Sequence, residues 1–251
     1  MRRAFAPLLI SAVEVKTSAG EVPTSAGEGV TLQVHVSSDL LTSQSGMLSV
    51  ELIRFADVPA TPAGTSFRSH VVIKPQADAV YASVPLAPLL AAARTDRNHS
   101  IILMTFTPKV HSTGGDGSTS TATAAATSTA SAAASSTASS TASSTASSTA
   151  SSTAYHWLTP PKWAVLPRAS LTLSPAHQLS PTQAQLSVST NATAAFVAVE
   201  STAAIGAFSD GAFMLLAGAN ATLQFSSREP LRSLTAFQAG LEARSLRDTY
   251  E

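Results

Sequence analysis

Cysteine is absent from this 251-residue chain, and charged residues make up only 12% of it, against roughly 25% in an average domain. Without cysteine, a disulfide framework, thiolate catalysis and the usual cysteine-containing zinc sites are excluded. The 15 basic and 15 acidic residues cancel, so no nucleic acid partner is expected, because phosphate binding needs clustered positive charge. No apolar run of about 18 residues occurs, and the sequence therefore predicts no membrane span.

The amino-terminal segment is open to two interpretations. Met1–Arg2–Arg3 followed by the apolar run from Ala4 to Val13 has the basic head and short apolar stretch of a signal peptide. The same residues can also form a first β-strand. Pro7 interrupts the run and no clear cleavage site of small residues follows, so we prefer the strand.

The tract from Ser112 to Ala154 is of low complexity, with five copies of Ser-Ser-Thr-Ala from Ser135 to Ala154. It contains no large apolar side chain, so it cannot bury enough surface to offset its ordering entropy, and we predict that it is disordered. An O-glycosylated stalk is one interpretation. A tolerated expansion of a surface loop is the other and the preferred one, since closure entropy rises slowly with loop length.

Elsewhere, short apolar segments separated by Gly, Pro and Ser are typical of an all-β protein. Before the tract, the predicted strands are 12–17, 30–36, 47–55, 67–73, 79–84 and 100–107, with helical turns over 85–94. After it they are 155–158, 170–173, 184–189, 195–200, 212–216, 221–225 and 237–244. We predict two immunoglobulin-like β-sandwiches. The first spans residues 1–168, with the insertion 112–154 in a hairpin loop, and the second spans 169–251.

A set of ordered motifs resembles one known family. The ending reads Phe-Ser-Asp-Gly-Ala-Phe-Met-Leu-Leu from Phe208, then Asn-Ala-Thr-Leu-Gln-Phe from Asn220, and closes on Ser-Leu-Arg-Asp-Thr-Tyr from Ser245. This is similar to the carboxyl terminus of lysosomal-type β-mannosidases of glycoside hydrolase family 2. Further segments follow the family's order, namely 3–9, 36–40, 47–50, 155–158, 161–165 and 195–197. Gly211 departs from the family's usual Asn, and the low-complexity tract has no counterpart there.

The resemblance implies a fold and a role. The segment 3–9 would follow the family's catalytic (β/α)₈ barrel, and the strands on either side of the tract would pair as a hairpin. The family hydrolyses terminal non-reducing β-D-mannose with retention, using two barrel glutamates. Those segments have no counterpart in this sequence, so no catalytic residue is carried over. The implied partner is the barrel, with carbohydrate bound only through the parent enzyme, which the resemblance places in the lysosome or outside the cell.

The residues themselves offer little chemistry. Retaining glycosidases need two carboxyl groups about 5 Å apart, whereas the acidic residues here read as isolated, solvated charges (Glu14, Glu21, Glu28, Glu51, Asp210, Glu229, Glu242 and Asp248). The six histidines have no metal spacing, so neither a metal nor a cofactor is expected. No nucleophile elbow, P-loop or dinucleotide fingerprint occurs. Asp210 precedes Gly211 and is interpreted as a turn residue.

Two tryptophans and three sequons are the remaining candidates. Trp157 and Trp163 flank a Pro-Pro pair. They can stack on sugar rings, or they can pack between the sandwiches or against the family's catalytic barrel, and packing is preferred. The sequons predict N-glycosylation at Asn98, Asn191 and Asn220.

The preferred interpretation is the non-catalytic carboxyl-terminal portion of a β-mannosidase-like glycosidase, inactive by itself. The alternative is a free-standing secreted Ig-like binding or adhesion module with a mucin-like loop. If the first is right, the apolar segment from Arg3 to Ile10 should be a poorly covered edge strand. Surface of that kind favours self-association.

Overall fold

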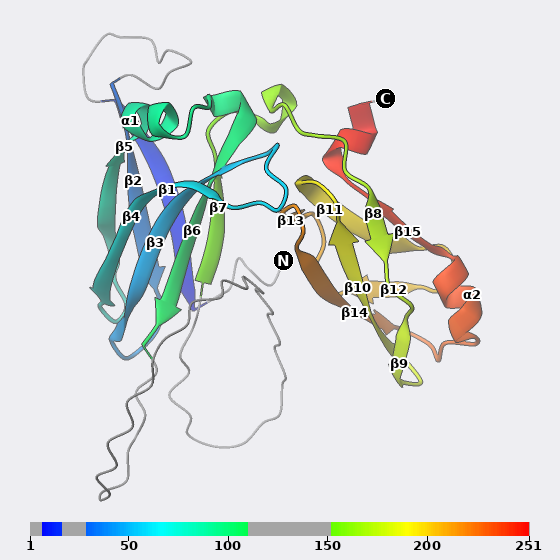
Figure 1. Ribbon diagram of the computed structural model, residues 1–251. Helices are drawn as coiled ribbons and strands as arrows, with labels where there is room; N and C mark the ends of the chain where they lie inside the picture. The colour runs from blue at the N-terminus through cyan, green and yellow to red at the C-terminus, as the bar shows by residue number, and fades with distance from the viewer. Residues whose placement is uncertain (1–6, 17–28, 110–151, 251) are drawn as a thin grey trace, which may run out of the picture.

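The computed structural model describes residues 7–16, 29–109 and 152–250. These residues form two β-sandwiches that lie side by side (Figure 1). The predicted all-β class with two immunoglobulin-like sandwiches is confirmed. Residues 112–151 of the predicted disordered tract lie outside the described residues. The predicted boundary between residues 168 and 169 stays a prediction, and it falls in the linker between the last strand of the first sandwich and the first strand of the second.

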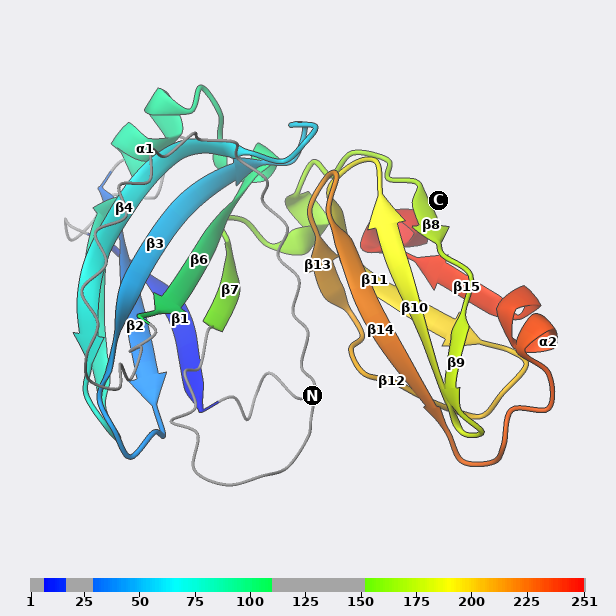
Figure 2. The ribbon, with the colours of Figure 1, turned by 60° about the horizontal axis from the view of Figure 1, so that its bottom comes forward.

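The first sandwich has a three-stranded and a four-stranded antiparallel sheet. The smaller has the order β1-β2-β5, with bounds Leu8–Lys16, Val30–Ser38 and Asp78–Pro85. The larger has the order β4-β3-β6-β7, with bounds Pro62–Ile73, Gln44–Arg54, Ser100–Pro108 and Ser152–Trp157. Figure 2 shows the two sheets facing each other. The short helices α1 (Leu86–Ala92) and η2 (Arg97–His99) connect β5 to β6.

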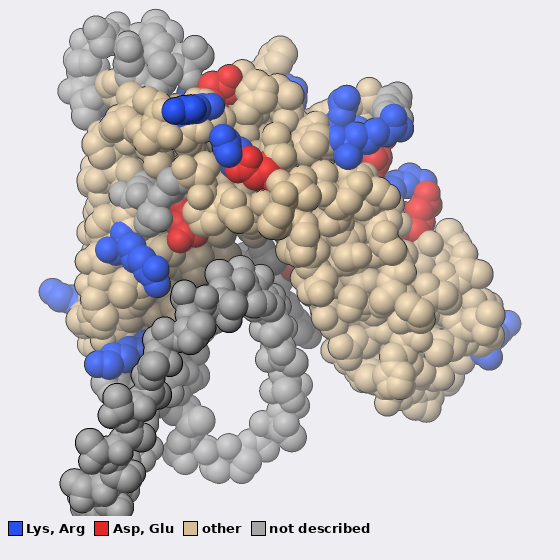
Figure 3. Space-filling model, viewed as in Figure 1, with Lys and Arg blue, Asp and Glu red and all other residues tan. Residues whose placement is uncertain are grey.

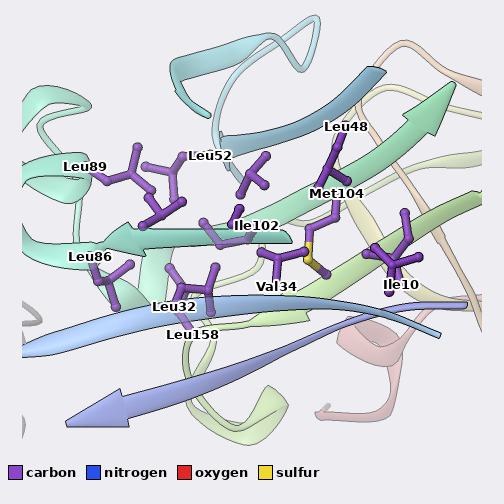
Figure 4. Packing of buried hydrophobic residues seen from close by; sticks show 14 of the residues in the cluster. Ile10, Leu32, Val34, Leu48, Leu52, Leu86, Leu89, Ile102, Met104 and Leu158 are labelled. Atoms are coloured by element: carbon purple, nitrogen blue, oxygen red, sulfur yellow. The ribbon is translucent and has the colours of Figure 1, made fainter. Parts of the chain in front are cut away.

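The core of the first sandwich follows from the period of two along its strands. In β2 every second residue is buried, and Leu32, Val34 and Val36 are fully enclosed. They meet aliphatic side chains of the opposite sheet, including Leu52 and Ile102 (Figure 4). Each such side chain stabilises the fold by about 1.5–3 kcal/mol through burial. The alternation predicted over 30–36 is therefore confirmed.

The second sandwich is built in the same way from shorter strands. One sheet has the order β12-β14-β10-β8, with β9 also paired to β10, and bounds Gly206–Phe208, Asn220–Ser227, Gln183–Thr190, Leu171–Leu173 and His177–Ser180. The other has the order β13-β11-β15, with bounds Phe213–Leu215, Ala194–Ser201 and Leu241–Arg244. Strands β9 and β12 were not predicted from the sequence. Aromatic rings fill part of the core, as Phe225 lies 5.0 Å from Phe208 and 4.8 Å from Phe237 between ring centroids.

Three short helices complete the second half of the chain. They are η3 (Pro161–Trp163), α2 (Leu234–Ala239) and η4 (Leu246–Tyr250). The strand predicted over 237–244 is wrong in its first half, because α2 occupies those residues and only Leu241–Arg244 is strand. Ser233 caps α2 by accepting a hydrogen bond from the Ala236 amide at 3.3 Å, and Gly240 ends it. A serine cap and a closing glycine are helix signals that the apolar content obscured.

Two further expectations are corrected at strand ends. Strand β7 begins at Ser152, inside the predicted disordered tract, since Ser152 pairs with Phe106 and Ala154 with Met104. Strand β1 begins at Leu8 and forms the edge of its sheet. Leu8 and Ile10 are 1% and 2% exposed in the first core, because β2 positions them against the opposite sheet. Within its described part, the segment expected to be a poorly covered edge strand is indeed an edge strand, but only one of its faces is exposed, since Leu9 is 44% exposed whereas Leu8 and Ile10 are buried. Among the described residues no helix is long and apolar enough to cross a membrane.

Candidate functional site at the junction between the sandwiches

An apolar cluster lies between the two sandwiches and is built from residues of both. It is here called the junction cluster. It begins with a row across three strands of the first sandwich, where Ile53 pairs with Ile101 and Ile101 pairs with Trp157. Ile53 and Ile101 are at most 1% exposed although they lie on the outer face of their sheet. The partner surface is supplied by the linker and the second sandwich. The members from those segments are Ala164, Leu166, Ala195, Met214, Leu216 and Leu246.

Strand alternation sorts the side chains of β7 between two environments. Tyr155 and Trp157 point to the junction cluster, whereas Ala154 packs against the first core and His156 lies on the same face as Ala154. Trp157 has Phe55 on one side, with ring centroids 5.9 Å apart, and Phe196 on the other at 5.7 Å. The Trp157 and Phe196 rings are nearly parallel, at 5°. Such aromatic pairs contribute about 0.5–1.5 kcal/mol beyond burial. The packing interpretation of Trp157 is confirmed.

Phe196 reaches Trp157 because β11 is irregular at this point. Ala194 pairs with Leu215 but Val197 pairs with Phe213, so β11 contains an extra residue. Phe196 has a φ of 51°, a left-handed conformation that costs a bulky residue free energy. The bulge brings Ala195 into the junction cluster and places Phe196 beside Trp157. We interpret it as a device that gives the second sandwich an aromatic contact across the junction.

Backbone contacts accompany the apolar ones. The Ala60 amide donates to the Ala217 carbonyl across the junction at 3.0 Å, and the Val165 amide of the linker donates to the Asn98 carbonyl at 2.8 Å. Gly218 has a φ of 78°, and a Cβ there would lie 3.3 Å from the Pro59 side chain. The Ala60–Ala217 hydrogen bond and the close approach of Gly218 to Pro59 join the two sandwiches directly. The Val165–Asn98 hydrogen bond joins the linker to the first sandwich.

A cluster of charged side chains lies at the edge of the first sandwich beside the junction. Arg97 donates to both carboxylate oxygens of Glu14, at 2.7 and 2.6 Å, and His156 Nε2 lies 3.3 Å from the same carboxylate. All three side chains are less than a quarter exposed. Burial by itself raises the pKa of Glu14, but hydrogen bonds from His156 and Arg97, with the positive charge of Arg97, outweigh it and lower that pKa below its ordinary 4.5. The expectation that Glu14 is a solvated surface charge is wrong.

Some other charged groups among the described residues pair with residues near them in sequence. Arg54 pairs with Asp57 at 2.9 Å, and Asp96 accepts from His99 at 2.7 Å. These two pairs border a shallow hollow of about 480 Å³ beside α1. Their charges are already partnered there. Asp210 accepts from the Gly211 amide at 2.9 Å, as expected of a turn residue. In the part of the chain that the structure describes, no group of three His, Cys, Asp or Glu residues could hold a metal ion.

Charged side chains cover little of the face seen in Figure 3.

The three sequon asparagines are all exposed. Asn98 lies in η2, Asn220 opens β14, and Asn191 Oδ1 accepts from the Ser170 amide at 2.7 Å. Trp163 is 63% exposed, so it does not pack between the two sandwiches, and its packing against a catalytic barrel stays a prediction. Its ring is contacted by Lys162 Nζ at 5.1 Å from the centroid.

Comparison with known proteins identifies the second sandwich. Residues 166–249 match the family model of the Ig-fold domain called Ig_mannosidase. Over these residues the second sandwich is therefore similar to that Ig-fold domain. The match runs from β8 into η4 and includes the Phe196 bulge. The junction-cluster residues within it are Leu166, Ala195, Met214, Leu216 and Leu246. No curated protein matches the chain.

Solved structures extend the likeness of fold to both sandwiches. A β-D-mannosidase from Dictyoglomus thermophilum aligns with 98% of this chain at 10% identity, with a TM-score of 0.58, over 22% of its own length. An exo-chitosanase from Amycolatopsis orientalis aligns with 97% of this chain at 11% identity, with a TM-score of 0.42, over 27% of its length. The chain thus spans about a quarter or less of these proteins.

Proposed function

We propose that this chain is the non-catalytic Ig-like portion of a β-mannosidase-like glycosidase, whose parent enzyme hydrolyses terminal non-reducing β-D-mannose residues. The observation that carries the proposal is the match of residues 166–249 to the mannosidase Ig-fold domain. Its partner is then the catalytic barrel of the parent enzyme, and carbohydrate is bound through that barrel. We also propose a lysosomal or extracellular location for the parent.

The junction cluster supports a bracing role. A non-catalytic portion can hold a neighbouring domain in place only if its own parts do not move relative to each other. The contacts of the Trp157 ring with Phe55 and Phe196, with the Ala60–Ala217 hydrogen bond, would provide that rigidity. The half-buried carboxylate of Glu14 has Arg97 and His156 as neighbours, which is an ion-pair arrangement and not the pair of facing carboxyl groups that glycoside hydrolysis uses.

The test has two arms. The first is the sequence of the full transcript, which should encode a barrel with two catalytic glutamates upstream of Arg3. The second is an assay with a chromogenic β-mannoside, in which the purified chain should show no turnover and the full-length product should be active. A transcript without a barrel would overturn the proposal. Turnover by the chain alone, lost on substitution of one of its own residues, would also overturn it.

A further inference from the structure

An exposed apolar strip runs along the linker between the sandwiches. Trp163 and Val165 are 63% and 52% exposed, while Ala164 and Leu166 between and beside them face the junction cluster. The strip is fixed in place, because the Trp163 amide donates to Pro160 at 2.8 Å and the Val165 amide donates to Asn98 at 2.8 Å. The Trp163 indole has Lys162 Nζ 5.1 Å from its ring centroid but is still largely exposed to water, so a further covering group would stabilise it.

One candidate covering group is attached next to the strip. The Asn98 carbonyl that accepts from Val165 belongs to the sequon Asn98-His99-Ser100. Asp96 fixes the backbone of this turn by accepting from the amides of Asn98 and His99, at 2.9 and 3.1 Å. Asn98 is exposed, so its side-chain amide is open to a glycan. A sugar attached to Asn98 would therefore begin beside Val165 of the apolar strip, because the two backbones are hydrogen-bonded to each other.

We propose that Asn98 carries an N-linked glycan whose first N-acetylglucosamine packs on Trp163 and Val165. The transfer forms a bond from Asn98 Nδ2 to the anomeric carbon of the sugar. A lipid-linked pyrophosphate leaves from that carbon, and the amide loses one proton. Ser100 is fully buried and its hydroxyl donates to the Asp96 carbonyl at 2.6 Å, so the transfer precedes folding of this turn. The apolar C–H face of the sugar ring then replaces water on the Trp163 indole. An indole suits this position because it is stable with an apolar neighbour on one side and water on the other.

The other two sequons serve as internal controls. Asn191 lies beside Ser170, and Asn220 lies opposite Ser189 in the β10–β14 ladder. Both have small polar neighbours, whereas the backbone of Asn98 is hydrogen-bonded to Val165, two residues after Trp163. Glycans at Asn191 or Asn220 therefore should not change the solvent access of either tryptophan. The proposal depends on passage through a glycosylating compartment and is independent of the parent activity proposed above.

The experiment uses the full chain with a supplied secretion leader, expressed in a glycosylating eukaryotic host. Peptide mass spectrometry measures occupancy at each sequon. A Trp157→Phe background leaves Trp163 as the only tryptophan, and acrylamide quenching then reports its access to solvent. Quenching is compared after an endoglycosidase that leaves one N-acetylglucosamine and after an amidase that removes the whole glycan. Asn98→Gln and Asn191→Gln variants are the matched controls.

Asn98 should be occupied, and quenching of Trp163 should rise about two-fold only when the last sugar is removed, since a stacked ring covers one face of the indole. The Asn98→Gln variant should show the high quenching from the start, and Asn191→Gln should not. An unoccupied Asn98 would overturn the proposal, whether or not the other sequons are occupied. Equal quenching of Trp163 with and without the glycan on an occupied Asn98 would overturn it as well.

Discussion

The two sandwiches share an architecture but differ in what fills them. The first core is almost entirely aliphatic, with Phe106 as its one fully buried ring among the described residues. The second is smaller and more aromatic, with Phe213, Phe225 and Phe237 buried in it. Alternating aliphatic residues are common to many sheets and predict only the fold class. Aromatic rings in contact prefer particular geometries, so they restrict how the strands that carry them can be arranged. The family match falls on the aromatic sandwich.

The largest expected effect tests the aromatic core directly. Phe225→Ala should lower the unfolding free energy by about 4 kcal/mol, because it removes a ring that contacts two others and leaves a cavity. Leu32→Ala in the aliphatic core is the counterpart and should cost about 3 kcal/mol. Urea unfolding measures both values. A larger loss for Leu32→Ala than for Phe225→Ala would show that the ring contacts add nothing to stability.

A junction substitution asks whether the sandwiches unfold together. Trp157→Ala should lower the unfolding free energy by about 2–3 kcal/mol, because it removes contacts with Phe55 and Phe196. It should also separate thermal unfolding into two transitions by differential scanning calorimetry, where the unchanged chain shows one. Trp157→Phe is the conservative control and should keep a single transition. Two transitions in the unchanged chain would mean that the junction does not couple the sandwiches.

The charged cluster distinguishes the first sandwich by its pH dependence. The pKa of Glu14 is lowered on folding, so its contribution to stability is present above its ordinary value of 4.5 and is lost as pH falls through the folded value. Glu14→Gln should therefore cost about 1–2 kcal/mol at neutral pH, by leaving Arg97 unpaired, and much less at about pH 3. Urea unfolding of both proteins across this range checks the sign. A cost that does not shrink at low pH would contradict it.

The smallest effect concerns the exposed tryptophan. Trp163→Ala in protein made without glycans should change the unfolding free energy by no more than about 0.5 kcal/mol, as for most surface substitutions. The ring is 63% exposed and lies outside the junction cluster. The contrast with Trp157→Ala, measured in the same urea experiment, would establish that the two tryptophans have different roles. A loss of 2 kcal/mol or more, roughly the value of a buried ring, would show hidden packing.

Sequence patterns predicted the regular parts of this fold and missed the irregular ones. Strand β2 was predictable because Leu32, Val34 and Val36 alternate with polar residues. The Glu14 cluster was not, because Arg97 is 83 residues away and His156 is 142 residues away from Glu14 along the chain. Ion pairs between such distant residues leave no local pattern.

The junction was predictable only in part. Two tryptophans beside a Pro-Pro pair indicated a packed corner, yet Trp157 is partly buried in the junction and Trp163 faces solvent. The alternation of Trp163 and Val165 outward with Ala164 and Leu166 inward decides this, and it depends on the path of the linker. The bulge at Phe196 was likewise hidden, because an extra residue in one strand shows only once its partner strand is known.

The hairpin of β6 and β7 also makes the first sandwich a natural host for insertions. Its ladder runs from Ile101–Trp157 beside the junction to Phe106–Ser152 at the opposite end, where the connecting loop leaves and returns through paired residues. Chain added between Lys109 and Ser152 lies beyond the paired residues of β6 and β7, so we expect it to change neither the register of this ladder nor the spacing of the junction row. An affinity tag, a reporter or a second folded domain could be spliced in there. The closure cost rises only with the logarithm of its length.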